Sequence, residues 1–288
     1  MSPLYKLIYF PFLYSSQYFS VTTNYSLSNF SKFSFLVLFP ILLLSLMSHA
    51  AFARDFSTVG YSPDDLTSID NIINLFETWM EKHSKIYKSI DEKLHRFEIF
   101  RDNLKHIDER NNIVSNYWLG LNELADLSHD EFKKMYLGLK VQNERSHDKS
   151  TQEFIYRDFM DLPKSVDWRK RDESEVVTID GYHDVPANDE QSLLKALANQ
   201  PVSVAIEASG RDFQFYKGGV FDGHCGTALD HVVAAVGYGS TKGLDYIIVK
   251  NSWGLKWGEK GFIRMKRNTG KVQGLCGINK MASFPIKN

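Results

Sequence analysis

The spacing of apolar residues changes once along this chain, and that change restricts the fold more than any other feature. Between residues 70 and 112, apolar side chains recur at three- and four-residue steps among charged residues, as they do on amphipathic helices. After residue 200, short apolar runs are separated by glycine-rich turns, which is typical of strands. The pattern predicts an α+β protein with a helical first half and a mostly antiparallel β unit behind it. We expect helices at 70–87, 91–112 and 189–200, and strands at 202–206, 231–238, 245–250 and 261–266.

Charge and cysteine content exclude several classes of protein. The formal net charge of -1 over 288 residues, with no basic stripe interleaved with aromatic residues, argues against a nucleic-acid partner. The chain has two cysteines. Two thiols permit one disulfide or one thiol pair, but neither a disulfide-dense scaffold nor a four-cysteine zinc site.

The segment 1–53 has the composition of a targeting sequence. It contains no Asp or Glu, and Lys32 precedes an apolar run at 33–47 that is followed by small residues up to Ala53. We expect a secretory signal cleaved near Ala53, because the run is shorter than a bilayer span and Pro40 interrupts it. A start codon placed too far upstream, or a transit peptide, are alternatives for the residues before Lys32. Secretion predicts an extracellular, vacuolar or lysosome-like destination without a stable membrane anchor.

Six residues of the second predicted helix lie at successive steps of four, four, three, four and four, which places them along one stripe. An ordinary surface helix would explain the apolar members alone. The whole set matches the E-x3-R-x3-F-x2-N-x3-I-x3-N signature and therefore resembles the inhibitory prosegment of papain-like cysteine peptidases. The signature residues are Glu92, Arg96, Phe100, Asn103, Ile107 and Asn111, and a second motif, G-x-N-x-F-x-D, is matched by Gly120, Asn122 and Asp126 with Leu124 in place of Phe.

The resemblance implies a helical prosegment at 54–140 that docks on the enzyme and runs through its active-site cleft opposite to a substrate. A polar, aperiodic linker is expected at 141–161. The residues 162–169 (LPKSVDWR) resemble the start of a mature peptidase, so 162–288 is the expected peptidase domain. The sequence as a whole is most similar to the plant xylem branch of the family.

Two motifs in the β unit carry chemistry. A His that begins a strand is by itself more often structural, but LDH followed about 20 residues later by IVKNSWGLKWGEKGF is specific to this family. The resemblance implies that His231 is the catalytic base, that Asn251 orients it, and that Trp253 shields their hydrogen bond from water. No metal or organic cofactor is implied.

Further roles are implied by the same resemblance. Cys225 and Cys276 match a disulfide of the β half, whereas a metal site that includes His224 lacks further ligands. Ala205, Val232 and Met281 match the apolar pocket for the side chain two positions before the scissile bond. Val232 stands where Gly or Ala is usual, so it would narrow this pocket or press on His231.

The segment that should carry the nucleophile is missing. Family members have a C-G-[SA]-C-[WY] segment about 130 to 150 residues before the His. Here Arg171, the last residue that follows the family pattern, lies only 60 residues before His231. The shortfall of roughly 70 to 90 residues includes the nucleophilic Cys, the oxyanion-hole Gln and most of the helical half of the enzyme.

We therefore expect a peptidase precursor by family, whose protein or peptide substrates require a complete isoform, and an inactive chain in the present form. A non-catalytic, prosegment-type inhibitor of related peptidases and a misassembled gene product are the alternatives.

Overall fold

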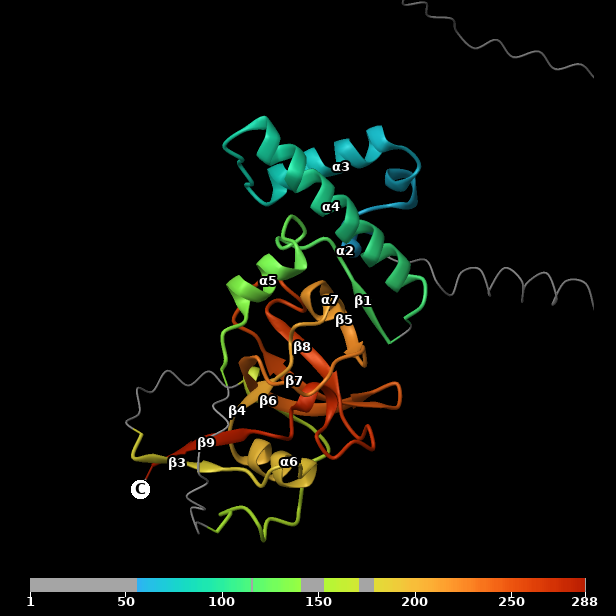
Figure 1. Ribbon diagram of the computed structural model, residues 1–288. Helices are drawn as coiled ribbons and strands as arrows, with labels where there is room; N and C mark the ends of the chain where they lie inside the picture. The colour runs from blue at the N-terminus through green and yellow to red at the C-terminus, as the bar shows by residue number, and fades with distance from the viewer. Residues whose placement is uncertain (1–55, 115, 141–152, 171–178, 288) are drawn as a thin grey trace, which may run out of the picture. The chain divides into compact units, whose positions relative to one another are not determined.

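The computed structural model describes residues 56–114, 116–140, 153–170 and 179–287, which belong to one compact unit (Figure 1). The expected signal at 1–53, the first part of the expected linker and the chain just after Lys170 lie outside the described residues. We call residues 56–140 the helical part and residues 162–287 the β part. No helix of the described residues is long and apolar enough to cross a membrane.

Serine caps define where the helices of the helical part begin. Ser68, Ser89 and Ser128 each accept a hydrogen bond from the backbone N–H three residues later, which satisfies an amide that the helix leaves unpaired. The helical part consists of α2 (Phe56–Val59), η1 (Pro63–Leu66), α3 (Ile69–Lys82), α4 (Ile90–Asn111), β1 (Tyr117–Leu119) and α5 (His129–Tyr136).

The first predicted helix ends earlier than its periodicity suggested. The expected range reached residue 87, whereas α3 stops at Lys82 and Ser84 takes a left-handed conformation with φ of 54°. A residue in the left-handed conformation ends a right-handed helix. No Gly or Pro marks this helix end in the sequence.

The β part is one sheet with short helices. Its elements are β2 (Val166–Asp167), η2 (Trp168–Lys170), β3 (Gly181–Asp184), α6 (Glu190–Asn199), β4 (Val202–Ile206), α7 (Arg211–Gln214), β5 (Tyr216–Phe221), β6 (His231–Thr241), β7 (Leu244–Lys250), β8 (Phe262–Lys266), η3 (Leu275–Gly277) and β9 (Ala282–Ile286). The strand order is β1-β5-β8-β7-β6-β4-β9-β3, and β2 pairs with β6. Every pairing is antiparallel except that of β5 with β8. The expected α+β fold with a mostly antiparallel sheet and few helices is confirmed.

The helical part contributes an edge strand to this sheet. In the antiparallel pair of β1 and β5, Tyr117 lies opposite Gly219 and Trp118 lies opposite Gly218. A Cβ atom on Gly219, which has φ of 92°, would lie 2.4 Å from the Asn116 carbonyl oxygen. Glycine is therefore required for β1 to approach β5.

The signature stripe on α4 holds the helical part together. Phe100 is fully buried, and its ring centroid lies 5.1 Å from Phe76 and 5.2 Å from Trp79. Asn111 exchanges two hydrogen bonds with the backbone of Leu119, and the Asn103 amide donates to the backbone oxygens of Ala125 and Leu127. The two asparagines thus act as backbone partners for the segment that carries the second motif.

Two charged residues of the motifs, Arg96 and Asp126, meet at that segment. Arg96 donates to Glu131 at 2.8 Å and to the Asp126 carbonyl oxygen at 3.0 Å. The Asp126 carboxylate in turn accepts hydrogen bonds from Lys85 and Tyr87. Glu92 has a local role, since it accepts the Lys88 N–H just before α4 begins. Most contacts of the signature residues are therefore structural and lie within the helical part, but Asn103 also accepts a hydrogen bond from Arg211 of the β part, and Asn122 donates one to the Gln214 carbonyl oxygen.

Candidate active site

The pairing of β6 with β7 brings the two predicted catalytic side chains together. β6 begins at His231, β7 ends one residue before Asn251, and the two strands are antiparallel. The His231 Nε2 atom lies 2.9 Å from the Asn251 Oδ1 atom. The Ser252 N–H also donates to that oxygen, at 2.8 Å, so the oxygen accepts both bonds and Nε2 must carry a proton. The other ring nitrogen, Nδ1, is then the one that can accept a proton from a thiol when the ring is neutral.

Aromatic side chains cover the His231–Asn251 pair. His231 is 7% exposed, and its ring centroid lies 5.1 Å from that of Trp253. Trp253 packs edge-on against Phe213 and Trp257. Burial lowers the pKa of His231, while the Asn251 hydrogen bond and the Asp230 charge act in the opposite direction. The imidazole is accordingly neutral at neutral pH and available as a base.

A disulfide and one carboxylate shape the loop that leads into His231. Cys225 and Cys276 are bonded, with their Cα atoms 5.1 Å apart, and so form the pair that the family resemblance implied. The Glu207 carboxylate accepts the N–H groups of Gly226 and Ala228 at 2.8 and 2.6 Å. Because these are the only two cysteines of the chain, no free thiol remains to act as a nucleophile.

The three expected pocket residues lie next to one another. Ala205 is opposite Val232 in the β4–β6 pair, and its N–H donates to the Met281 carbonyl oxygen at 3.0 Å. Val232 is 47% exposed and Met281 is 42% exposed, whereas Ala205 is buried between them. His231 is buried and Val232 half-exposed, as alternating strand side chains require, so Val232 points away from the imidazole. The strand geometry therefore argues against pressure of Val232 on His231, and the narrowed pocket stays a prediction.

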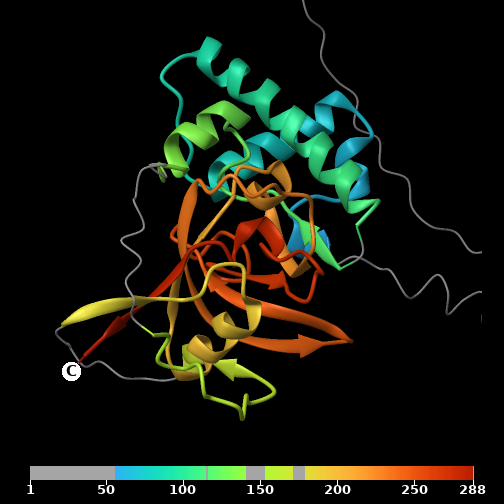
Figure 2. The same ribbon diagram turned by 60° about the horizontal axis from the view of Figure 1, so that its bottom comes forward.

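The helical part covers the histidine site. Phe132 and Tyr136 of α5 place their rings edge-on to Trp253, with centroids 5.2 and 5.9 Å away. Three residues after α5, the Leu139 N–H donates to the Asp230 carbonyl oxygen at 3.0 Å, directly before His231. In Figures 1 and 2, α5 (light green) lies beside the orange strands of the β part. The α5 segment therefore occupies the surface around the predicted base.

A buried carboxylate of the β part forms a second attachment. Asp212 on α7 is 6% exposed and accepts hydrogen bonds from Arg110 (2.9 Å) and Tyr117 (2.6 Å) of the helical part. His106 Nε2 lies 3.0 Å from the same carboxylate. These bonds lower the pKa of Asp212 to about 2, although burial alone would raise it. Sequence reasoning missed this cluster, because one Asp in a short helix and three polar residues 95 to 106 positions earlier share no local pattern.

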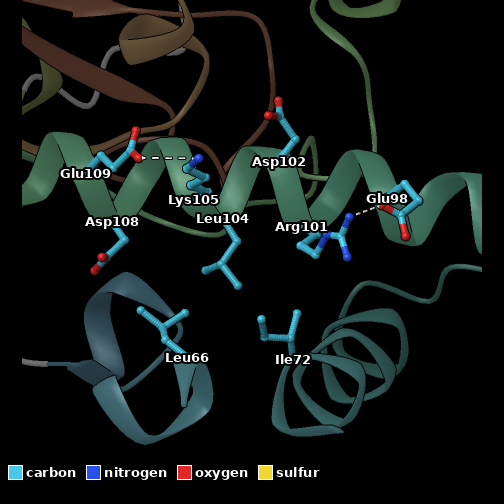
Figure 3. A pocket seen from close by; sticks show the side chains of 9 residues that line it. All are labelled: Leu66, Ile72, Glu98, Arg101, Asp102, Leu104, Lys105, Asp108 and Glu109. Atoms are coloured by element: carbon cyan, nitrogen blue, oxygen red, sulfur yellow. Dashed lines mark hydrogen bonds and ion pairs between the residues drawn. The ribbon is translucent and has the colours of Figure 1, made fainter. Parts of the chain in front are cut away.

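A cavity of about 640 Å³ in the helical part is separate from these contacts. Figure 3 shows Leu66, Ile72 and Leu104 pointing toward one another between α4 and the elements η1 and α3. At its rim, Arg101 pairs with Glu98 and Lys105 pairs with Glu109. None of the predicted catalytic or pocket residues lines it.

Two family models match this chain. The family model "Papain family cysteine protease" matches residues 129–286, and "Cathepsin propeptide inhibitor domain (I29)" matches residues 76–132. The chain is 50% identical to "Cysteine protease XCP2" of Arabidopsis thaliana over 84% of this chain and 94% of that protein. It is 39% identical to "Papain" of Carica papaya over 81% of this chain and 92% of that protein.

Solved precursor structures share the fold. The proform of the Amb a 11 cysteine protease, a major ragweed pollen allergen, superposes with a TM-score of 0.69 at 26% identity, over 79% of this chain and 89% of that chain. Recombinant stem bromelain precursor superposes with a TM-score of 0.64 at 28% identity, over 74% of this chain and 98% of that chain.

The alignment with the Arabidopsis protein also bears on the missing segment. It runs over 335 positions, but 84% of 288 residues is about 242, so about 93 positions contain no residue of this chain. This number is close to the shortfall that the spacing between Arg171 and His231 predicts.

Proposed function

Since this chain belongs to the papain family of cysteine proteases and carries the family's inhibitory prosegment, we propose that it holds a docked prosegment but hydrolyses no peptide bond. By family it is a cysteine protease precursor. The observation that carries the proposal is the cysteine content of the chain, because both of its cysteines form the Cys225–Cys276 disulfide.

The chemistry of the family explains the loss. A thiolate attacks the peptide carbonyl, the imidazolium protonates the leaving amine, and water then hydrolyses the acyl-enzyme. His231 and Asn251 could serve the proton transfers, but no sulfur is available to form the acyl bond. A nucleophile and its base act as a unit, so the loss of one costs about 10⁶-fold in rate in the measured protease example.

A direct assay tests the proposal. The full chain should hydrolyse fluorogenic peptides at the buffer rate from pH 4 to 7, whereas papain at the same concentration gives a strong signal. Reductant could free the two cysteines, so the Cys225→Ser/Cys276→Ser double variant is assayed beside the parent. Hydrolysis that scales with the concentration of either chain would overturn the proposal.

A chimera tests whether the remaining half of the site is competent. The segment of the Arabidopsis protein that this chain lacks is inserted after Arg171. We expect thiol-dependent peptidase activity that His231→Ala reduces by at least about 10⁴-fold. The same insertion with its nucleophilic cysteine replaced by alanine is the control. An inactive but folded chimera would show that the β part cannot support the chemistry.

Inhibition of related peptidases is a second candidate function, and the complete signature on α4 favours it. The contacts with α7, β5 and Trp253 occupy the surface of the helical part that a related enzyme would need. The full chain should therefore inhibit papain weakly. Asp212→Ala should loosen the internal contact and improve inhibition, while the exposed control Asp70→Ala on α3 should not. Equal inhibition by all three proteins would end this idea.

The route through the cell is also a proposal. The composition of 1–53 supports entry into the secretory pathway, with an extracellular or vacuolar destination. Fusion of these residues to a fluorescent protein in plant cells tests it, and a cytosolic signal would contradict it.

A further inference from the structure

The cavity between α4 and the elements η1 and α3 has an apolar wall (Figure 3). Its volume of about 640 Å³ is within the range of small-molecule sites. Leu104 on α4 is only 1% exposed, whereas Leu66 on η1 and Ile72 on α3 are half-buried. The wall is therefore deepest at Leu104 and meets solvent at the other two side chains.

One carboxylate belongs to the same wall. Asp108 follows Leu104 by four residues, so both lie on one face of α4, and Figure 3 shows both side chains pointing toward η1 and α3. The carboxylate accepts hydrogen bonds from the Tyr61 hydroxyl at 3.2 Å and from the Asn112 amide at 3.4 Å. Both donors are neutral and both bonds are long, so each carboxylate oxygen keeps a lone pair for a further donor.

The charges around the cavity leave Asp108 without a counter-charge. The lining contains four acids and two cations. Three of the acids are in ion pairs, which are Glu98 with Arg101, Glu109 with Lys105, and Asp102 with Arg211 of the β part. No cation of the described residues is paired with Asp108, so the cavity favours a positively charged ligand.

From this arrangement we propose that the cavity binds a small amphipathic amine. Its alkyl chain lies against Leu66, Ile72 and Leu104, and its ammonium group pairs with the Asp108 carboxylate. The proposal concerns the helical part and is independent of the proposed function.

The walls of the cavity favour a small molecule over an extended peptide. All lining residues lie on η1, α3 and α4, and no strand edge of the described residues takes part. The backbone groups of helices bond mostly within the helix, so an extended peptide would find few partners for its own N–H and C=O groups. An alkyl amine has a single polar group, for which Asp108 is sufficient.

A ligand series on the full chain tests the proposal. Hexylammonium, which keeps its charge at pH 7 as a lysine side chain does, is titrated while the methyl NMR signals of Leu66, Ile72 and Leu104 are followed. We expect saturable shifts with a Kd of about 1 mM or below. Hexan-1-ol, which lacks the charge, should bind about 5- to 10-fold more weakly, and hexanoate and methylammonium at least about 10-fold more weakly.

A matched pair of variants tests the carboxylate. Asp108→Asn keeps the shape of the side chain and removes its charge, so hexylammonium should bind about 5- to 10-fold more weakly and no better than hexan-1-ol. The affinity for hexan-1-ol should not change. Asp91→Asn, at an exposed position in the first turn of α4 and outside the cavity, should bind both ligands as the parent does.

Two further measurements keep the test decisive if Asp108→Asn fails to fold. The ligand series needs no variant, and equal affinities of the parent for hexylammonium, hexan-1-ol and hexanoate would overturn the proposal. Ile72→Phe, which fills part of the apolar wall, should abolish the binding of both hexylammonium and hexan-1-ol. Unchanged binding by folded Ile72→Phe, or the absence of saturable shifts at the three methyl-bearing residues of the parent, would also overturn it.

Discussion

Asn111 shows how one side chain can replace a strand neighbour. It is 1% exposed, donates to the Leu119 carbonyl oxygen at 3.0 Å and accepts the Leu119 N–H at 2.8 Å. These are the two bonds that an adjacent strand would supply to β1. The amide suits this position because it carries a donor and an acceptor side by side, as a peptide group of a neighbouring strand would.

Asn111→Ala should destabilise the protein by about 2 to 4 kcal/mol, because it leaves a buried N–H and a buried C=O without partners. Asn74→Ala, at an exposed position on α3, should change stability by less than about 0.5 kcal/mol. Urea unfolding followed by circular dichroism measures both. A small effect of Asn111→Ala would mean that water replaces the amide.

At the scale of elements, the contact of β1 with β5 depends on a glycine that no hydrophobic pattern marks. Gly219 has φ of 92° and faces the Asn116 carbonyl oxygen, so β5 is shaped to receive a strand from the helical part. The sequence run YKGGVF has two central glycines and no alternation, so sequence reasoning did not predict a strand there.

Gly219→Ala should open the β1–β5 pair, since its Cβ would lie 2.4 Å from a backbone oxygen. We expect a loss of about 3 kcal/mol or more and faster exchange at 117–119. Gly243→Ala in the β6–β7 turn is the matched control, because φ there is also positive, 78°, but nothing lies within 4 Å. Its cost should be about 1 kcal/mol. Equal effects of the two variants would contradict the role of close approach.

Sequence reasoning identified the elements that carry their own periodicity and missed those that depend on a partner. The helix α4, the strands β4, β7 and β8 and the proximity of His231 to Asn251 were within reach, because helical spacing and family motifs encode them locally. The three-residue strand β1, the end of α3 at Lys82 and the Asp212 cluster were not. β1 and the Asp212 cluster exist only through contacts with residues distant in sequence, and the end of α3 depends on the left-handed conformation of Ser84, which no Gly or Pro marks.

At the scale of the whole molecule, the two parts share one hydrophobic core. A single cluster of buried hydrophobic side chains contains residues of both parts, among them Val59 in α2 and Phe284 in β9. Neither part can unfold without exposing apolar surface of the other. Shared burial of this kind makes unfolding cooperative.

The helical and β parts should accordingly unfold in a single transition. Helix loss by circular dichroism and tryptophan fluorescence, to which Trp168, Trp253 and Trp257 of the β part contribute beside Trp79 and Trp118 of the helical part, should give coincident urea curves at pH 7. Two separated transitions would show that the parts are independent, and a chain that never folds would support a misassembled gene product.

The disulfide contributes to this stability by closing a loop. Cys225 and Cys276 are separated by 51 residues, for which loop-closure entropy gives about 4 kcal/mol. The Cys225→Ser/Cys276→Ser variant should unfold at lower urea concentration by an amount within about 2 to 4 kcal/mol. Reductant should have the same effect on the parent and none on the variant. A parent insensitive to reductant would show that the bond does not form in solution.

Trp253 has two sets of neighbours, with His231 on one side and Phe132 and Tyr136 on the other. If the chain hydrolyses no peptide bond, as we propose, natural selection no longer acts on the first contact, but it still acts on the second as long as the folded protein is useful. Among natural alleles of this gene, substitutions at Asn251 should therefore accumulate before substitutions at Trp253. The order in which substitutions appear at the two positions would show whether the folded protein stayed useful after catalysis was lost.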